Sequence, residues 1–289
     1  MSLRPPDPRA VERAVAAALA EDLGERGDVT SAAAVSAAAR ARAGLVARED
    51  LVVAGLPVAA EVFRQVDATI AFAPRVADGA RARGGTVVAT ATGPARALLA
   101  AERTALNFLQ RMCGIATATA SAVAEVTGTG AVILDTRKTA PGLRALDKYA
   151  VAAGGGTNHR MGLHDAAMVK DTHLGAGGSL GDAVRACLAA GLPREAVTAE
   201  VRDERELIEA IEAGAGRALL DNMDLATLAA CVARGKGRIV LEASGGLRPG
   251  SLRRVAETGV DALSLGYLTH SVRAADLAMD LALVAKDER

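Results

Sequence analysis

Residues 198–246 read TAEVRDERELIEAIEAGAGRALLDNMDLATLAACVARGKGRIVLEASGG, and three short apolar segments in this stretch are separated by two longer amphipathic ones. The apolar segments have the length of strands, and the amphipathic segments Glu204–Ala213 and Leu225–Ala233 have the length and spacing of helices. Strands that alternate with helices form a parallel sheet, either in a barrel or in a doubly wound fold. The stretch therefore predicts an α/β protein.

The same alternation continues on both sides of this stretch. Helical segments are expected at Leu180–Ala190 and Ser251–Glu257. Six strands are predicted in all, fewer than the eight of a complete (β/α) barrel. They are Ala131–Asp135, Ala167–Lys170, Thr198–Val201, Ala218–Asp221, Ile239–Glu242 and Ala262–Leu265.

The first third of the chain has a different pattern. Asp7 and Pro8 are typical of a helix start, and apolar residues then recur at intervals of four. A long helix is predicted at Leu98–Glu125, with small residues at Gly114–Ala122 that allow close packing. Between these helices we expect a small α+β domain, built from strands at Leu45–Ala47, Thr69–Phe72 and Thr86–Thr90 and a helix at Pro57–Val66.

Composition narrows the class of protein. The 289 residues fit two domains or one α/β barrel with additions, and 51% of them are hydrophobic. Lys and Arg number 34, as do Asp and Glu, so the net charge indicates neither a nucleic-acid partner nor an anionic membrane. No segment approaches the about 20 apolar residues of a membrane span, and Met1–Asp22 lacks the apolar run of a signal peptide.

The three cysteines indicate a reducing compartment. Cys113, Cys187 and Cys231 are odd in number, far apart, and form no CxxC pair. Neither a disulfide framework nor a cysteine zinc site is expected. We therefore expect a cytoplasmic location.

Polar or charged residues stand at the ends of the predicted strands. In parallel α/β folds the ligand binds at the carboxyl ends of the strands. Five groups that are or can be cationic gather there: Arg137, Lys138, His159, Arg160 and Lys170. For each one alone, a solvated face with salt bridges is the simpler interpretation. As a set, they favour a pocket for a substrate with several negative charges.

Two glycine runs are candidate anion sites. Gly154–Gly156 could let backbone N–H groups approach an anion, although most such runs only mark turns. Ser244, Gly245 and Gly246 follow a strand and precede a helix, which is typical of a phosphate site in a barrel. The chain lacks a GxxxxGK[ST] loop, so a P-loop nucleotidase is not supported.

Glu200 and Asp221 end consecutive strands. Paired carboxylates can act as acid and base, or can bind ribose hydroxyls or magnesium. The second role fits a basic pocket better, because a ligand with both hydroxyl and phosphate groups needs both signs of charge. Lys170 could also form a Schiff base, which is a rival enzyme class.

Several motifs resemble the quinolinate phosphoribosyltransferase family, also called carboxylating nicotinate-nucleotide pyrophosphorylases. The resemblance covers nearly the whole chain. It is carried by Glu21–Gly24, Gly27–Thr30, Ala101–Asn107, Leu134–Arg144, Gly154–Leu163, Leu220–Met223 and Leu241–Gly246.

The resemblance implies a homodimer whose sites are shared between subunits. Each subunit would have an N-terminal α/β sandwich domain at 1–110 and an incomplete six-stranded (β/α) barrel at 111–271. A C-terminal helix at 272–289 would pack on the first domain. The implied reaction joins quinolinate to phosphoribosyl pyrophosphate, with magnesium, and gives nicotinate mononucleotide, pyrophosphate and carbon dioxide on the route to NAD.

The resemblance also implies roles for individual residues. Lys138, Lys170, Glu200 and Asp221 would be catalytic, and Arg103 would reach the site from the partner subunit. Glu200 and Asp221 would hold the ribose hydroxyls and perhaps the magnesium ion. Arg137, His159, Arg160 and Lys170 would hold the two quinolinate carboxylates, with Lys138 beside them, and Thr136 would also belong to the substrate-binding set. The phosphate contacts would be Ser244, Gly245, Gly246, Leu265, Gly266 and Tyr267.

Two positions depart from the family pattern. Thr172 stands where many members have Asn, and Ala140 stands where a second Thr is frequent. Three alternatives stay open: a related protein associated with molybdenum transport, a lyase that uses Lys170, and a non-catalytic anion-binding protein on the same scaffold.

Overall fold

The computed structural model describes residues 3–174 and 178–284, which form two compact units. The first unit comprises 1–120, 139–155 and 271–289, and the second comprises 121–138 and 156–270. Three segments of the chain form the first unit and two form the second. The expected boundary at residue 110 implied fewer crossings between the units. No helix in the described part of the chain combines the length and apolarity that a membrane span requires.

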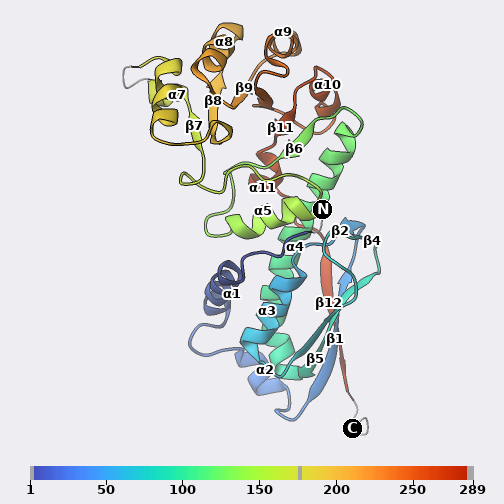
Figure 1. Ribbon diagram of the computed structural model, residues 1–289. Helices are drawn as coiled ribbons and strands as arrows, with labels where there is room; N and C mark the ends of the chain where they lie inside the picture. The colour runs from blue at the N-terminus through green and yellow to red at the C-terminus, as the bar shows by residue number, and fades with distance from the viewer. Residues whose placement is uncertain (1–2, 175–177, 285–289) are drawn as a thin grey trace. The chain divides into compact units, whose positions relative to one another are not determined.

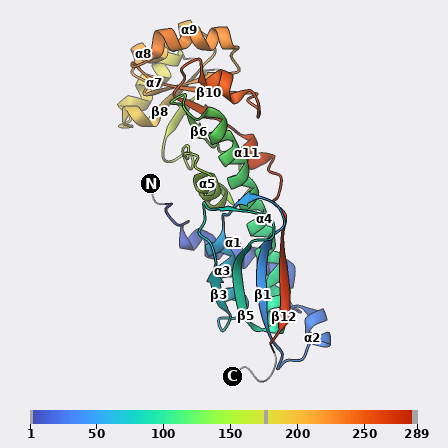
Figure 2. The same ribbon diagram turned by 90° about the vertical axis from the view of Figure 1, so that its right-hand side faces the viewer.

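The first unit is a four-stranded antiparallel sheet with helices on one face (Figures 1 and 2). Its sheet has the order β12-β1-β5-β3, and β2 pairs with β4 in a separate ribbon. The elements are α1 (Pro8–Leu23), α2 (Val29–Ala34), β1 (Arg40–Ala47), β2 (Leu51–Val52), α3 (Leu56–Val66), β3 (Ala71–Pro74), β4 (Arg81–Ala82), β5 (Val87–Pro94), α4 (Ala95–Val126), α5 (Arg144–Ala153) and β12 (Leu277–Leu283).

The expected start of α1 is confirmed. The Asp7 carboxylate accepts a hydrogen bond from the backbone N–H of Arg9, and Pro8 opens the helix. Val11, Val15 and Leu19 then form the buried face. Such caps each stabilise a helix by about 1 kcal/mol, and the apolar face contributes the rest through burial.

The long helix α4 packs closely against its neighbours in the first unit. A Cβ on Gly114 would lie 2.2 Å from the carbonyl oxygen of Arg273, and one on Gly154 would lie 2.4 Å from that of Ala116. These contacts require glycine. They explain the small residues that the sequence places in this part of α4.

The C-terminal segment is a strand, so the predicted helix at 272–289 is wrong. β12 pairs antiparallel with β1, with Leu45 opposite Met279. In β12 the residues Leu277, Met279 and Leu281 alternate with Ala278 and Asp280, and this period of two suits an edge strand. The part of the prediction at 285–289 lies outside the described residues.

Helix α5 belongs to the first unit, although it lies beyond the boundary expected at residue 110. Two buried contacts hold it there. The Arg111 guanidinium donates to both carboxylate oxygens of Asp147, at 2.9 and 2.8 Å. The Tyr149 hydroxyl donates to Asp78 at 2.6 Å, and Asp78 in turn accepts from the backbone N–H of Gly55 at 2.9 Å.

The second unit is a parallel six-stranded sheet with helices, as expected. Figure 1 shows its strands and helices alternating along the chain. The elements are β6 (Val132–Leu134), β7 (Ala167–Val169), α6 (Asp171–Leu174), α7 (Leu180–Ala189), η1 (Arg194–Ala196), β8 (Val197–Val201), α8 (Glu204–Ala213), β9 (Arg217–Asp221), α9 (Leu225–Gly235), β10 (Val240–Ser244), α10 (Leu252–Ala256), β11 (Ala262–Ser264) and α11 (Tyr267–His270).

The strand order decides between the two folds that the alternation left open. The order β6-β11-β10-β9-β8-β7 places the first strand of the unit beside the last. A doubly wound sheet would reverse direction near its middle, whereas this order runs consecutively around a barrel. In the described residues β6 and β7 are the two edges, so the barrel is open between them.

Capping residues start the helices directly after the strands. Asp203 accepts from the backbone N–H of Glu206 at the start of α8, and Asp224 accepts from that of Thr227 at the start of α9, both at 2.8 Å. Each cap lies within three residues of a strand end. The turns at the carboxyl edge of the sheet are thus short and well defined.

Candidate active site

A cavity of about 190 Å³ lies in the second unit, at the carboxyl ends of its strands. Its walls contain most of the predicted site residues, which is the position expected in a barrel. The volume suits one single-ring molecule and is below the about 300 Å³ of a typical ligand pocket. The predicted residues that line it are Thr136, Arg137, Lys138, His159, Arg160, Lys170, Glu200, Asp221 and Ser244.

A larger cavity of about 690 Å³ lies in the first unit, between α1 and α4. It includes Arg13 and Arg111 but none of the predicted site residues. Arg111 is already paired with the buried Asp147. Because the smaller cavity brings cations and carboxylates together at the carboxyl ends of the strands, it is the better candidate for chemistry.

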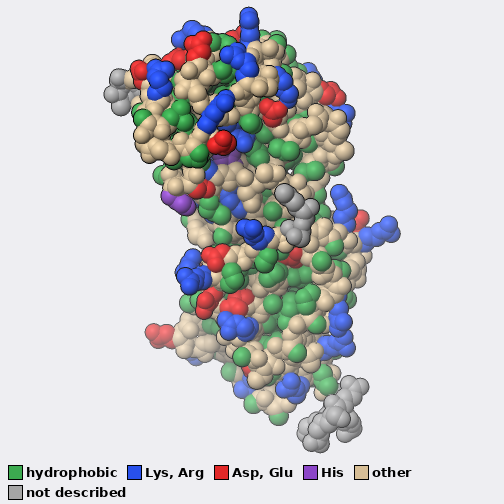
Figure 3. Space-filling model, in the orientation of Figure 1, with side chains coloured by type: hydrophobic (Ala, Val, Ile, Leu, Met, Phe, Trp, Pro, Cys, Tyr) green, Lys and Arg blue, Asp and Glu red, His purple; other side chains and the backbone are tan. Residues whose placement is uncertain are grey.

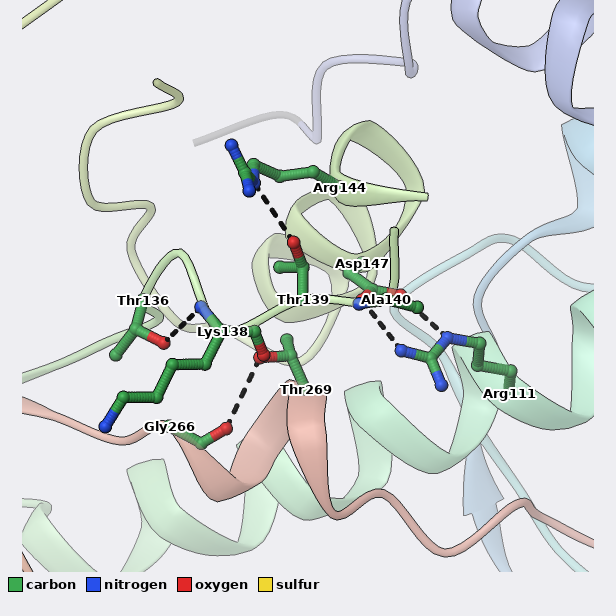
Figure 4. Close-up of polar contacts among 9 residues, drawn as sticks. All are labelled: Arg111, Thr136, Lys138, Thr139, Ala140, Arg144, Asp147, Gly266 and Thr269. Atoms are coloured by element: carbon green, nitrogen blue, oxygen red, sulfur yellow. Dashed lines mark hydrogen bonds and ion pairs between the residues drawn. The ribbon is translucent and has the colours of Figure 1, made fainter. Parts of the chain in front are cut away.

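Lys138 is held through its backbone. Its N–H donates to the Thr136 hydroxyl at 3.0 Å, a contact drawn in Figure 4. Its carbonyl accepts from the hydroxyl of the buried Thr269 at 2.8 Å. A Cβ on Gly266 would lie 3.0 Å from Cδ of Lys138, so glycine leaves room for this side chain.

Two of the cations are anchored before any ligand binds. Lys170 forms an ion pair and a short hydrogen bond with Glu200. Arg160 donates from Nη1 to the carbonyl oxygen of Ala166 at 2.8 Å. Burial, and then the charge of Arg137, lower the pKa of Arg160, but a guanidinium stays protonated at neutral pH. The two guanidinium charges repel, which favours an anion between them.

The loop after α5 is attached to the end of β6. Thr157 forms a bridge with Leu134, and the buried Asp135 accepts from the side chain of Asn158 at 2.7 Å and from the backbone N–H of His159 at 2.8 Å. Two charge-assisted bonds to one buried carboxylate make this connection rigid. The side chains of His159 and Arg160 are thereby placed beside β6.

The phosphate loop predicted at Ser244–Gly246 packs against Asn222, a non-glycine residue with a left-handed backbone conformation. Asn222 has φ +53°, and its side chain donates to Asp221 at 2.9 Å. Gly245 has φ +90°, and a Cβ there would lie 2.3 Å from Oδ1 of Asn222. The turn after β9 and the loop after β10 therefore fit together only when residue 245 is glycine.

Some predicted residues do not line the cavity. Arg103 is exposed on α4 and belongs to the first unit. Gly245 and Gly246 adjoin Ser244, while Leu265, Gly266 and Tyr267 follow β11. Burial, and then the charge of Glu125, raise the pKa of Tyr267 to about 12. Their roles stay predictions.

Four further residues line the cavity: Met168, Leu219, Glu242 and Ser264. Met168 and Leu219 supply apolar contact area. Glu242 ends a predicted strand, but the sequence predicted no role for it. The period-two alternation of β10 was the available signal, since Ser244 and Glu242 lie two residues apart and share a face.

The chain matches two family models of known proteins. Residues 28–113 match the N-terminal domain of quinolinate phosphoribosyl transferase, and residues 115–280 match its C-terminal domain. This chain belongs to the quinolinate phosphoribosyl transferase family.

Individual members of that family are similar over most of their length. The carboxylating nicotinate-nucleotide pyrophosphorylase of Mycobacterium leprae is 45% identical, over 91% of this chain and 94% of the relative. A probable carboxylating nicotinate-nucleotide pyrophosphorylase of Bacillus subtilis is 41% identical, over 91% and 90%. The crystal structure of NadC from Streptococcus pyogenes has a TM-score of 0.92 at 36% identity, over 98% of this chain and 100% of that one.

One of the departures from the family pattern has a physical explanation. The backbone N–H of Ala140 donates to Asp147 at 3.1 Å, and Asp147 also holds Arg111 (Figure 4). The adjacent Thr139 hydroxyl accepts from Arg144 at 3.0 Å. Since the bond to Asp147 comes from the backbone of residue 140, it does not require a threonine side chain there.

The second departure lies on the surface. Thr172 is exposed in α6. Beside it, the backbone N–H of Lys170 donates to Nδ1 of His173 at 3.0 Å, and the backbone N–H of His173 donates to the carbonyl of Lys170 at 2.9 Å. His173 thus closes the turn that follows Lys170.

The carboxylates fit magnesium only as a shared ion. Among the described residues, no group of three or more His, Cys, Asp or Glu side chains could hold a metal. Glu200 and Asp221 offer the oxygen ligands that magnesium prefers, and substrate phosphates commonly supply the others. The residues therefore fit an ion that binds together with a phosphorylated substrate.

Proposed function

We propose that this chain transfers the phosphoribosyl group of phosphoribosyl pyrophosphate to quinolinate, with loss of carbon dioxide. The products are nicotinate mononucleotide and pyrophosphate, and the reaction serves the synthesis of NAD. The names of the relatives support the reaction. The observation that carries the proposal is a cavity in which Arg137, Lys138, Arg160 and Lys170 face carboxylates from β8 and β9.

The charges of the cavity match the two substrates. Quinolinate has two carboxylates on adjacent ring carbons, and a guanidinium fork can bind a carboxylate through two parallel hydrogen bonds. We assign this half of the recognition to Arg137, Arg160 and Lys170. Glu200 and Asp221 would accept hydrogen bonds from the ribose hydroxyls, and Ser244 with its two glycines would hold the phosphate.

The Lys170–Glu200 ion pair balances one positive and one negative charge of the cavity. Lys170 would exchange its bond to Glu200 for one to a substrate carboxylate. Glu200 would then be released to accept from a ribose hydroxyl. Substrate binding thus replaces an internal ion pair with one ion pair and one hydrogen bond to the substrates, which limits the cost of desolvation.

The chemistry needs no protein nucleophile. The pyridine nitrogen attacks the anomeric carbon of the ribose, the bond to pyrophosphate breaks, and positive charge develops on the ribose ring. The nitrogen then becomes a pyridinium, which accepts the electron pair that the adjacent carboxylate leaves when carbon dioxide departs. The ring carbon finally takes up a proton. Positioning and electrostatic balance are the tasks left to the protein.

Magnesium would assist this reaction by neutralising charge on the departing pyrophosphate. Glu200 and Asp221 are the residues proposed to hold it, mainly together with the substrate. Both carboxylates lie near the carboxyl ends of the adjacent strands β8 and β9. Glu200 on β8 pairs with Leu219 on β9, and Asp221 follows Leu219 by two residues.

We further propose that the enzyme works as a dimer with shared sites. Arg103 is exposed and lies outside the cavity of its own second unit. A second copy would bring its Arg103 to that cavity, as the family resemblance implies. The cytoplasmic location expected from the sequence also stays a prediction.

The direct test supplies quinolinate, phosphoribosyl pyrophosphate and magnesium to the purified chain and measures nicotinate mononucleotide. Nicotinate replaces quinolinate in the control, because it lacks the second carboxylate, and we expect little product from it. Tight quinolinate binding without product would instead support an anion-binding protein. Borohydride trapping of a substrate on Lys170 would support the lyase.

A further inference from the structure

Glu242 is a completely buried carboxylate at the base of the cavity, and the proposed reaction gives it no task. Arg217 donates from Nη1 to its Oε2 at 3.0 Å. The Ser264 hydroxyl donates a short hydrogen bond to its Oε1. Nε2 of His159 lies 3.4 Å from the same Oε1. One buried anion is thus surrounded by three donors.

The strand register explains this cluster. Glu242 pairs with Leu219 on β9 and with Ala262 on β11. Arg217 and Ser264 each lie two residues from those partners, so their side chains point to the same face of the sheet as that of Glu242. The carboxylate and its first two donors therefore belong to the inner wall of the barrel.

Glu242 is charged at neutral pH although it is buried. Burial by itself would raise its pKa, but the hydrogen bond from His159, the positive charge that a protonated His159 would add, the hydrogen bond from Ser264 and the charge of Arg217 outweigh burial and lower it. Arg217 already balances this negative charge. A second positive charge on His159 is therefore not required for neutrality.

The other ring nitrogen of His159 has a different partner. The backbone N–H of Arg160 donates to Nδ1 at 2.7 Å. A nitrogen that accepts a hydrogen bond through its lone pair carries no proton, so Nδ1 is unprotonated. The proton of the neutral ring then resides on Nε2, the nitrogen that faces Glu242.

We propose that Glu242 is a positioning residue that holds His159 as the uncharged Nε2–H tautomer, and that His159 in turn fixes the backbone of Arg160. The segment 158–160 is then attached to two buried carboxylates, Asp135 on one side and Glu242 on the other. The positive charge of the cavity then comes from Arg137, Lys138, Arg160 and Lys170, without a contribution from His159. The kinetic consequence rests on the proposed function, because it concerns quinolinate binding by Arg160.

The tautomer is tested directly by NMR on the whole chain with ¹⁵N-labelled histidine. The chain has 4 histidines, so the His159→Gln variant identifies the resonances of His159. Long-range ¹H–¹⁵N correlation spectra at neutral pH are expected to show a protonated Nε2 and an unprotonated Nδ1. An imidazolium pattern, or a proton on Nδ1, would overturn the proposal. This readout does not depend on enzymatic activity.

The positioning role is tested with Glu242→Gln, which keeps the shape of the side chain and removes its charge. We expect the His159 spectrum to change and KM for quinolinate to rise about tenfold, while KM for phosphoribosyl pyrophosphate stays within twofold. The matched control is Glu257→Gln, at an exposed ion pair with Arg253. It should change neither the spectrum nor KM.

Equal rises in both KM values for Glu242→Gln would indicate only a general structural role. Should this variant fail to fold, the wild-type spectrum still decides the tautomer. If the chain forms no nicotinate mononucleotide, the proposed function fails, whereas the spectrum continues to test the His159–Glu242 pair.

Discussion

The position of the Lys170 side chain in the cavity is fixed by an ion pair with Glu200. Its ammonium group is paired with Glu200, and 41% of its side chain is exposed to solvent at the cavity wall. Met168 and Leu219 line the same cavity and give it apolar contact area. A dicarboxylate that enters the cavity therefore meets an ordered cation.

We predict that Lys170→Ala reduces kcat/KM for quinolinate by roughly 30- to 1,000-fold, which corresponds to about 2–4 kcal/mol for a lost charge-assisted contact. Steady-state kinetics with each substrate varied in turn will measure it. Lys236→Ala is the control, because Lys236 pairs with Asp261 outside the cavity. Normal kinetics in Lys170→Ala would refute the assignment.

The charge of Glu242 predicts how the stability of the fold depends on pH. Its pKa in the folded chain is below the ordinary value of 4.5, so the carboxylate stabilises the fold above about pH 4.5. That contribution is lost as the pH falls through the folded pKa. Glu242→Gln is therefore expected to lower the free energy of unfolding by about 3 kcal/mol at pH 7, with the difference shrinking below about pH 4.5. Denaturant titrations across this range measure the difference, and one that is independent of pH would contradict the assignment.

Among the structural elements, the turns after β9 and β10 depend on each other. Asn222 adopts a left-handed backbone conformation and fills the space that a side chain at residue 245 would need. The first turn follows Asp221, which is proposed to bind the ribose, and the second carries the proposed phosphate loop. Their contact would link the two proposed parts of phosphoribosyl recognition.

Gly245→Ala is expected to raise KM for phosphoribosyl pyrophosphate at least tenfold and to leave KM for quinolinate nearly unchanged, because strain and a 2.3 Å contact would displace the loop. The control is Gly237→Ala. Gly237 also has a positive φ, +77°, but nothing lies within 4 Å of its added Cβ. The control should lose about 1 kcal/mol of stability and no activity. A similar effect of both variants on KM would contradict the proposed contact.

At the level of the molecule, the chain divides its functional groups between two units. On the face shown in Figure 3, Lys and Arg side chains are interspersed with Asp and Glu, in keeping with a formal net charge of zero. Most of the predicted site residues line one cavity in the second unit, whereas Arg103 belongs to the first. The proposed dimer with shared sites would account for this separation.

Mixing Arg103→Ala subunits with Lys170→Ala subunits is expected to restore activity that neither variant has alone. With random exchange, half of the dimers are hybrids with one intact site each, so recovery should reach about a quarter of the wild-type value. Product formation before and after mixing measures this. The shared site would be excluded by an absence of recovery when native mass spectrometry shows that subunits have exchanged.

Much of the fold was accessible from local patterns. The start of α1 followed from its capping residues and apolar spacing, which act within one or two helical turns. Helix α3 was located to within one residue, and α4 starts three residues before the predicted Leu98. β12 was predicted wrongly because the alternation in Leu277–Leu283 is weak, and its pairing partner β1 lies more than 200 residues away in the sequence.

The cationic residues of the site could also be predicted, since chemistry-bearing side chains at strand ends meet at one edge of a parallel sheet. The sequence could not predict which of these charges neutralise one another. Glu200 binds Lys170, and Glu242 lies among Arg217, Ser264 and His159, through the register of strands that are distant along the chain. Short-range periodicity in the sequence specifies the elements and their polar ends. The partner of a buried charge is settled only when separate strands align, because its desolvation must be balanced by whichever groups the fold brings within hydrogen-bonding distance.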